Sequence, residues 1–265
     1  MNRDMSMKLQ LAGVSKTFLG RKNRVLALEN ISLDVHKGEF VCLIGPSGCG
    51  KSTLLNIIAG LMQPERGSVL MDGTPIREPG PDRVVMFQDH ALFPWLTVLG
   101  NVEFGMKMKG VPREKRRALA QEFLRMVHLS AFEHAYTHEL SGGMKQRVAL
   151  ARALSINPDI LLMDEPFCSL DAQSREILQA ELQEIWSLTR KTIVFVTHNV
   201  REAVYLGNRV VVMSARPGRI KKDITIDLPR PRKLGSLEMI KVTNMVMQEL
   251  RGEIETVLKE ELHDA

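Results

Sequence analysis

The stretch Gly45-Pro46-Ser47-Gly48-Cys49-Gly50-Lys51-Ser52-Thr53 decides the fold, because it matches the phosphate-binding loop pattern G-x-x-x-x-G-K-[ST] at every fixed position. Glycines let consecutive backbone N–H groups turn toward one centre without interference from a Cβ atom, so such a loop forms a concave anion site. Lys51 adds a positive charge for the β- and γ-phosphates, and Ser52 adds an oxygen for Mg²⁺. The stretch therefore predicts a site for a nucleoside triphosphate.

The residues on either side of this loop supply the structure that it needs. Residues 39–44 (Glu-Phe-Val-Cys-Leu-Ile) are almost wholly apolar, which predicts a buried strand. Residues 51–61 carry an apolar stripe at helical spacing, which predicts a helix that begins inside the loop. Because the N-terminus of a helix attracts anions, the order strand, glycine loop and helix supports the phosphate site.

The composition is that of an ordinary globular chain. It has 265 residues, of which 44% are hydrophobic, enough for one large domain or two closely integrated ones. No run approaches the roughly 18 apolar residues that cross a bilayer, and residues 1–14 lack the apolar block of a secretory signal. We therefore expect a protein that stays in the cytoplasm. Its three cysteines have no metal-binding spacing and are expected to be free thiols: Cys42, Cys49 and Cys168.

Basic residues gather at residues 113–117 and again at residues 216–233, although the formal net charge is only +5. Each cluster has two interpretations: a solvated face, which we favour, or a docking surface for anionic lipid or nucleic acid. Aromatic residues make up 5% of the chain and do not alternate with the basic positions, as they do where single strands bind. No nucleic-acid partner is expected.

Hydrophobic patterns predict the remaining elements. Alternating apolar positions at residues 9–14 and 31–35 predict two antiparallel strands ahead of the buried strand. Residues 90–154 contain no convincing strand, which indicates a helical insertion. Alternating strands and helices after it predict parallel strands with helices on their faces. Further strands are expected at 68–71, 83–87, 160–163, 192–196 and 209–213, and helices at 113–127, 172–188, 200–206 and, after a linker at 229–232, about 237–262.

The apolar strand at 160–163 leads into two adjacent carboxylates, Asp164 and Glu165. Ligands of open α/β sheets bind at the carboxyl ends of the strands, which is where this pair lies. Because neighbouring side chains diverge there, one acid can face Mg²⁺ while the other addresses the water that attacks the γ-phosphate. We assign Asp164 to the metal, through water, since Mg²⁺ dehydrates reluctantly, and Glu165 to activation of the attacking water.

A second glycine pair opens the helix expected after residue 140. Ser141 is predicted to cap this helix, and Gly142 and Gly143 follow it, while Val148 and Leu154 continue an apolar stripe. Two glycines at a helix start expose amides to an anion, so this segment is a candidate second phosphate contact. The alternative is an ordinary capped turn.

Taken together and in order, these motifs resemble those of ABC-type ATPases over about residues 18–198. The resemblance implies an α/β fold of the P-loop NTPase type, with a RecA-like core, an antiparallel β subdomain and a helical insertion. Residues 1–89 and 159–228 would form the core with its β subdomain, residues 90–158 the helical subdomain, and residues 229–265 a helical tail. The motifs are the phosphate loop, Gln88, Leu140-Ser141-Gly142-Gly143-Met144, Asp164-Glu165-Pro166, Ser169-Leu170-Asp171 and His198.

The resemblance also implies how such a chain works. In ABC-type ATPases two ATP molecules are sandwiched between two nucleotide-binding domains, each contacted by the phosphate loop of one and the Ser-Gly-Gly of the other. This chain carries one copy of each half, so we expect a homodimer in which Ser141, Gly142 and Gly143 reach the γ-phosphate across the interface. In the same way, Gln88 is expected to approach Mg²⁺ and sense the membrane partner, and His198 to hold the γ-phosphate and the attacking water.

Two further positions take their roles from the resemblance. Asp171 would link the two sites at the dimer interface. Phe18 lies where the family has an aromatic residue that stacks on adenine, and an ordinary core phenylalanine is the alternative. Met144, where many members have glutamine, and Cys168, where a small residue is common, depart from the pattern without removing a catalytic group.

Residues 87–98 and 214–220, with the length of the chain, resemble the ATP-binding subunits of nitrate, sulfonate and taurine importers. This resemblance implies a peripheral protein on the cytoplasmic side of the inner membrane. It would power import of a small anion through separate transmembrane permease subunits and depend indirectly on a substrate-binding protein. Leu92, Phe93 and Trp95 either help form the groove that receives a helix of the membrane subunit or pack within the insertion.

Two other function classes stay open. A soluble ABC ATPase that acts on DNA or ribosomes would usually bring a coiled-coil insertion or a tandem second domain, and this sequence shows neither. A regulatory subunit would bind the nucleotide without hydrolysing it. Glu165 and His198 favour hydrolysis over that alternative.

Overall fold

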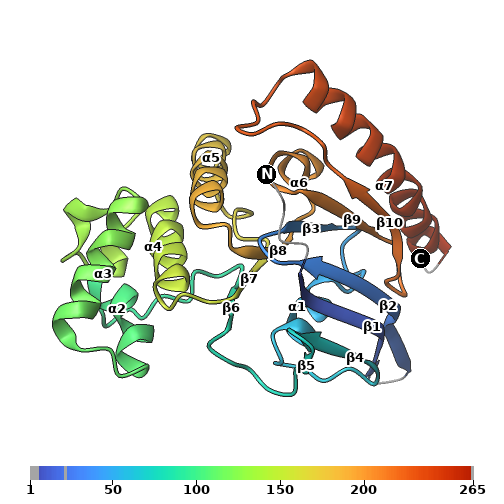
Figure 1. Cartoon of the computed structure of the whole chain (residues 1–265). Coiled ribbons are helices and arrows are strands. Elements are labelled where there is room, and N and C mark those ends of the chain that lie inside the picture. Colours follow the sequence, from blue (N-terminus) through green and yellow to red (C-terminus); the bar gives the residue numbers. More distant parts are fainter. Residues whose placement is uncertain (1–5, 21–22, 264–265) are drawn as a thin grey trace. The chain divides into compact units, whose positions relative to one another are not determined.

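The computed structural model describes residues 6–20 and 23–263, and the chain folds into two compact units (Figure 1). The first unit comprises Met1–Gly80 and Arg190–Ala265, and the second comprises Pro81–Thr189. Among the residues that the structure describes, no helix combines the length and the apolar character that a membrane span requires.

The first unit contains two groups of paired strands. In one, the order is β2-β1-β4-β5 and the pairs are antiparallel, as the alternating sequence pattern predicts. In the other, β3 lies between β9 and β8 and runs parallel to both, while β10 is antiparallel to β9. The strands are β1 (Met7–Leu19), β2 (Arg24–His36), β3 (Phe40–Ile44), β4 (Arg66–Met71), β5 (Thr74–Pro75), β8 (Thr192–Val196), β9 (Arg209–Met213) and β10 (Ile220–Thr225).

The core of the first unit lies around its parallel strands. Every residue of β3 and β8 is buried, because parallel strands have helices on both faces and must be apolar on both. The helix α1 contacts β8 and β2, whereas α6 contacts β3 and β9, and α7 packs on α6 and β9 (Figure 1). The helices of this unit are α1 (Lys51–Ile58), α6 (Val200–Leu206) and α7 (Leu237–His263).

The structure of the first unit differs from the predicted elements at one helix end and at one strand. The helix expected over 51–61 ends at Ile58, because Gly60 takes a left-handed φ of 77° and its N–H bonds back to the carbonyl of Ile57, a common way to end a helix. The strand β10 was not predicted. Most of its exposed positions are charged, as is typical of a strand at the edge of a sheet. Its residues therefore fall within the basic cluster, and the sequence pattern predicts no strand there.

The segment predicted to be a linker with a solvated basic cluster is instead partly buried. Arg232 is only 5% exposed. Its guanidinium donates to the carbonyls of Val204 (2.6 Å), Gly207 (2.6 Å) and Ile226 (3.1 Å), and so caps the end of α6. A cation stabilises this end of a helix, where unpaired carbonyls carry partial negative charge. Burial lowers the pKa of Arg232 to about 10. The tail is therefore bound to the helix that follows His198.

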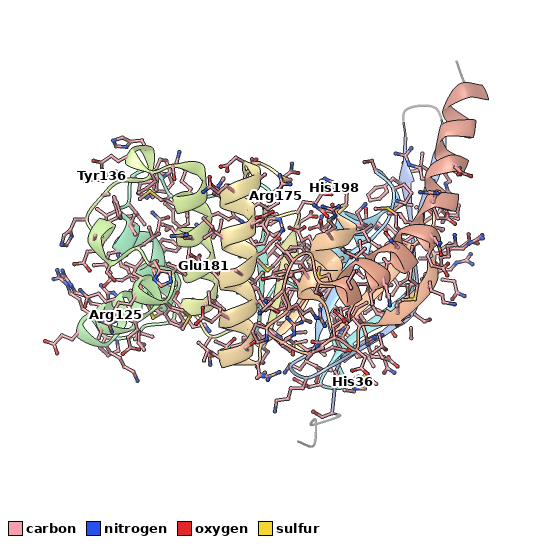
Figure 2. The ribbon with its side chains drawn as sticks, turned by 90° about the horizontal axis from the view of Figure 1, so that it is seen from above. His36, Arg125, Tyr136, Arg175, Glu181 and His198 are labelled. Atoms are coloured by element: carbon pink, nitrogen blue, oxygen red, sulfur yellow. The ribbon has the colours of Figure 1, made fainter. Side chains whose placement is uncertain are left out.

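The second unit contains a pair of parallel strands and four α-helices. Arg147 of α4 forms an ion pair at 2.7 Å with Glu181 of α5, which is labelled in Figure 2, and this pair links the two helices. Burial raises the pKa of Glu181, although Arg147 opposes the shift. The narrower helical subdomain, residues 90–158, stays a prediction. The elements are β6 (Arg83–Met86), β7 (Ile160–Asp164), α2 (Val98–Met108), α3 (Arg113–Met126), α4 (Gly142–Ser155) and α5 (Ala172–Thr189), with 3-10 turns at Ser130–Phe132 and Thr137–Glu139.

The helix α2 was not singled out from the sequence, because its glycines and β-branched residues are poor helix formers. Its position depends on Asn101, which is fully buried. The Asn101 side chain accepts from the N–H of Phe93 (2.8 Å) and donates to the carbonyls of Phe93 and Leu96 (both 3.2 Å). A buried amide thus fixes the turn that precedes α2, and Trp95 on this turn is 69% exposed.

Candidate nucleotide-binding site

In the first unit, the phosphate loop joins β3 to α1 as predicted. Gly48 and Gly50 have φ values of 73° and 98°, which side chains with a Cβ atom rarely adopt. The helix begins at Lys51, so its first N–H groups have no partner within the helix and face the loop. The Lys51 ammonium lies inside the loop and donates to the carbonyls of Gly45 (2.9 Å) and Pro46 (2.8 Å). The loop is thus an anion nest with a lysine at its centre.

The loop is also closely packed against its own Cys49 and against Met213 at the end of β9. A Cβ atom on Gly45 would lie 2.7 Å from the Cys49 sulfur and 3.0 Å from the carbonyl oxygen of Met213. Cys49 is fully buried, and burial raises the pKa of its thiol, although Lys51 opposes the shift. The glycines of this loop are therefore required by the fold of the chain itself. Ser47, Gly48 and Ser52 lie on the exposed side.

His198 lies in the turn between β8 and α6 (Figure 2), and its side chain is exposed. Its neighbours fix the backbone of this turn. The Thr197 hydroxyl accepts from the N–H of Asn199 at 3.0 Å, and the Asn199 side chain accepts from the N–H groups of Arg201 and Glu202. An Asn cap of this kind sets where the helix begins, so it also sets where His198 is presented.

Phe18 is not an ordinary core residue. It lies on β1 opposite Val25 of β2, and 37% of its surface is exposed. The Lys16 ammonium lies 6.0 Å from the centre of its ring. The core alternative is therefore wrong, and an aromatic face stays available to a flat ligand.

In the second unit, β7 ends at Asp164, and Glu165 follows in a left-handed conformation with φ of 44°. Such a conformation costs a residue other than glycine about 1–3 kcal/mol and is common at functional sites. The carbonyl of Glu165 accepts from the N–H of Cys168 at 3.2 Å. Arg175 of α5 (Figure 2) donates to the carbonyls of Phe167 (3.1 Å) and Leu170 (2.8 Å). The loop after the two carboxylates is thus held by an arginine that sequence analysis missed.

The structure brings Gln88 close to this loop. The strand β6 ends at Met86, and the exposed Gln88 follows it and hydrogen-bonds to the thiol of Cys168. Burial and the charge of Glu165 raise the pKa of this thiol, while Gln88 opposes the shift. Gln88, Glu165 and Cys168 therefore form one local cluster. The contact of Cys168 was not anticipated, because a thiol gives no sequence signal for a particular partner.

Ser141 caps α4 as predicted, and its hydroxyl accepts from the N–H of Met144 at 3.3 Å. Gly142 is exposed, and Gly143 is half-buried at the start of the helix. The carbonyl of Gly142 also lies 3.0 Å from Nε2 of His90, two residues beyond Gln88. The segment after Gln88 is thus connected to the helix that presents the second pair of glycines.

Asp171 immediately precedes α5, and its carboxylate accepts from the N–H of Ser174 at 2.9 Å. Hydrogen bonding from Ser174, by its side chain first and its backbone N–H second, lowers the pKa of Asp171. The structure therefore shows a helix cap at this position, and the predicted link between two sites stays a prediction.

A phosphate loop with its lysine, a carboxylate pair after an apolar strand and a glycine-opened helix define a nucleotide-hydrolysing P-loop protein. The chain belongs to the ABC transporter family, whose profile, described as "ABC transporter", matches residues 28–168. It is an ABC-type ATPase, and the predicted class of α/β fold is confirmed.

Several relatives are similar over most of their length. An uncharacterized ABC transporter ATP-binding protein of Methanocaldococcus jannaschii is 52% identical over 96% of both chains. The nitrate import ATP-binding protein NrtD of Synechocystis is 48% identical over 84% of both chains. The taurine import ATP-binding protein TauB of Rhizobium johnstonii is 46% identical over 94% of this chain and 96% of its own.

A solved structure of similar fold is described as the dimeric, post-hydrolysis state of the ATP-binding cassette MJ0796 bound to ADP and Pi. It is 34% identical, with a TM-score of 0.72, and the match covers 83% of this chain and all of that one.

Proposed function

We propose that two copies of this chain bind and hydrolyse ATP between them and so power import of a small anion through separate membrane subunits. The phosphate loop, residues 45–53, and Lys51 bind the β- and γ-phosphates of ATP, and Phe18 stacks on the adenine. Glu165 accepts a proton from the attacking water, and His198 donates a hydrogen bond to the γ-phosphate. ATP shifts the equilibrium from the open to the closed dimer because it binds the closed dimer more tightly. Hydrolysis removes this ligand, and the dimer reopens.

The donor set fits Mg²⁺ as the metal. Ser52, Gln88 and Asp164 offer hydroxyl, amide and carboxylate oxygens, which are the ligands that this hard cation takes together with water and phosphate. The described residues contain no group of three or more His, Cys, Asp and Glu side chains that could hold a metal by themselves. In this proposal Ser52 and Gln88 would hold the ion directly and Asp164 would hold it through water, and the ion would supply charge neutralisation at the phosphate oxygens.

The pairing of two chains rests on one observation, the space around the second pair of glycines. A Cβ atom on Gly142 or Gly143 would meet only ordinary contacts, at 3.8 Å from Leu170 and Ser174. Neither glycine has a left-handed φ. Unlike Gly45, Gly48 and Gly50, they are therefore not required by the chain's own packing. Their small size serves the close approach of something outside the chain, and a partner's triphosphate meets that description.

Replacing Gly143 by alanine should separate folding from function. Alanine is about 1 kcal/mol better than glycine inside a helix, so the free energy of unfolding should stay the same or rise. ATPase activity should fall, on the order of tenfold or more, because the added methyl group keeps the partner's phosphate from the amides. Urea unfolding and phosphate release measure the two effects on one sample. Full activity in the variant would remove the argument for pairing.

Import and the class of cargo are supported by the relatives that are named for nitrate and taurine import. The exposed Trp95, held by the turn before α2, offers an aromatic contact for a membrane subunit. In this proposal the chain lies on the cytoplasmic side of the inner membrane, and a substrate-binding protein delivers the cargo to the permease. The cargo itself is a small anion such as nitrate, a sulfonate or taurine.

Affinity purification from native membranes in mild detergent tests this function. A multi-spanning membrane protein should co-purify with the chain, and Trp95→Ala should reduce its recovery. Leu237→Ala, which removes an equally exposed apolar side chain on α7, should not reduce it. Deleting the gene should also abolish uptake of labelled nitrate or taurine. Recovery of ribosomes or DNA instead would favour a soluble ATPase.

A further inference from the structure

We propose that Arg216 is a positioning residue for the phosphate loop, and that the C-terminal helix α7 holds it in place through Glu253. The inference rests on the proposed nucleotide site and assigns a role to α7, which carries no nucleotide motif. All the residues concerned lie in the first unit.

Arg216 lies against the phosphate loop. Its Nε donates to the carbonyl of Gly48 at 3.0 Å. A Cβ atom on Gly48 would lie only 2.5 Å from Nη2 of Arg216, so the guanidinium covers this residue closely. In a peptide chain that turns its N–H groups toward an anion, the carbonyl groups must point elsewhere and need donors of their own. Arg216 supplies such a donor to Gly48.

The turn that carries Arg216 is fixed on several sides. The Ser214 hydroxyl donates to the carbonyl of Pro217 at 2.9 Å and accepts from the N–H of Arg219 at 2.9 Å. The N–H of Gly218 donates to the carbonyl of Ala27 on β2 at 2.9 Å. A Cβ atom on Gly218 would lie 2.1 Å from the carbonyl oxygen of Cys49, so this turn packs directly beneath the phosphate loop.

The helix α7 reaches the same turn through one carboxylate. Oε2 of Glu253 accepts from the N–H of Ala215 at 2.8 Å, one residue before Arg216. Oε1 of Glu253 forms an ion pair with Lys221 at 3.0 Å, and Lys221 also donates to the carbonyl of Glu249 on α7 at 2.8 Å. The side chain of Glu253 is only 17% exposed. Burial alone would raise its pKa, but the hydrogen bonds from Ala215 and Lys221 lower it overall, so the acceptor is a carboxylate.

A chain of direct contacts therefore runs from α7 through Glu253 and Ala215 to Arg216 and Gly48. If the hydrogen bond between Glu253 and the Ala215 N–H is lost, the turn is less fixed, and Arg216 no longer stays in position to donate to the Gly48 carbonyl. The loop amides then have to be ordered when the nucleotide binds, and this ordering weakens binding. The helix α7 therefore keeps the phosphate loop in the conformation that binds the nucleotide.

The test measures binding of a slowly hydrolysed ATP analogue with Mg²⁺ by calorimetry, and KM and kcat for ATP, in the full chain. Arg216→Ala should weaken binding about fivefold or more and raise KM, because a hydrogen bond of the loop is lost. It should change kcat less than about twofold, since the residue orders the loop and does not touch the reacting atoms. Glu253→Ala should weaken binding about two- to threefold, and Glu253→Gln, which keeps an acceptor for Ala215, should restore most of it.

Arg219→Ala is the matched control. Arg219 lies on the same turn but pairs with Glu29, so its loss should leave nucleotide binding unchanged. The double variant Arg216→Ala/Glu253→Ala should bind as weakly as Arg216→Ala alone, because both changes break one chain of contacts. Independent, additive effects would overturn the role of α7, and unchanged binding in Arg216→Ala would overturn the whole inference. Failure of the unaltered chain to bind the analogue would instead contradict the proposed function.

Discussion

Replacing Glu165 by glutamine should leave ATP binding intact and nearly abolish turnover. Glutamine has almost the same shape but cannot accept the proton of the attacking water, so the rate should fall by about 10²–10⁴-fold. ATP should then hold two chains together, because the ligand that favours the closed pair is no longer consumed. Light scattering with MgATP should show the mass double from that of one 29.8 kDa chain, while phosphate release is almost lost.

The surroundings of Glu165 make this substitution a clean one. Glu165 has a φ of 44°, and hydrogen bonds from Arg175 hold the loop that follows it. A glutamine side chain, which has the same length, should therefore point the same way. Glu184→Gln on the exposed surface of α5 makes the same chemical change and should behave like the unaltered chain. Undiminished turnover in Glu165→Gln would refute its role as the base, and a strictly monomeric variant with filled sites would refute the pairing.

Replacing Lys51 by methionine should weaken nucleotide binding itself. A hydrogen bond to a charged group contributes about 1.5–3 kcal/mol, which corresponds to a loss of affinity of about 10- to 100-fold. The structure adds a second effect, because the ammonium also donates to the carbonyls of Gly45 and Pro46. Lys51 is only 6% exposed, so its loss should also lower the free energy of unfolding, by about 1–3 kcal/mol.

Calorimetry with an ATP analogue and urea unfolding measure these two effects separately. Lys222→Met on the exposed face of β10 is the control, and it should change neither. A variant of Lys51 that keeps full affinity would show that the loop binds the phosphates without this charge. A variant that loses affinity but not stability would show that the two carbonyl contacts contribute nothing to the fold.

Much of the site could be predicted because its chemistry depends on local sequence. The positive φ values of Gly48 and Gly50 and the cap at Ser141 are set by residues within one turn of each position. The strands β8 and β9 and the helix α6 have the predicted bounds, since continuous apolar runs and helical spacing mark them directly. Patterns of this kind also place Asp164 at the end of β7.

The sequence by itself therefore determined the class of fold, the phosphate loop and the order of the motifs, because each depends on neighbours along the chain. Only the tertiary structure decided which polar groups meet across long separations. Arg232 caps α6, Arg216 covers Gly48, and Glu253 holds the turn that carries Arg216, although the sequence around these residues does not indicate their partners. The physical reason is that the local sequence around a basic residue is the same whether its side chain faces water or a buried carbonyl. Only tertiary packing brings the acceptor within hydrogen-bond distance.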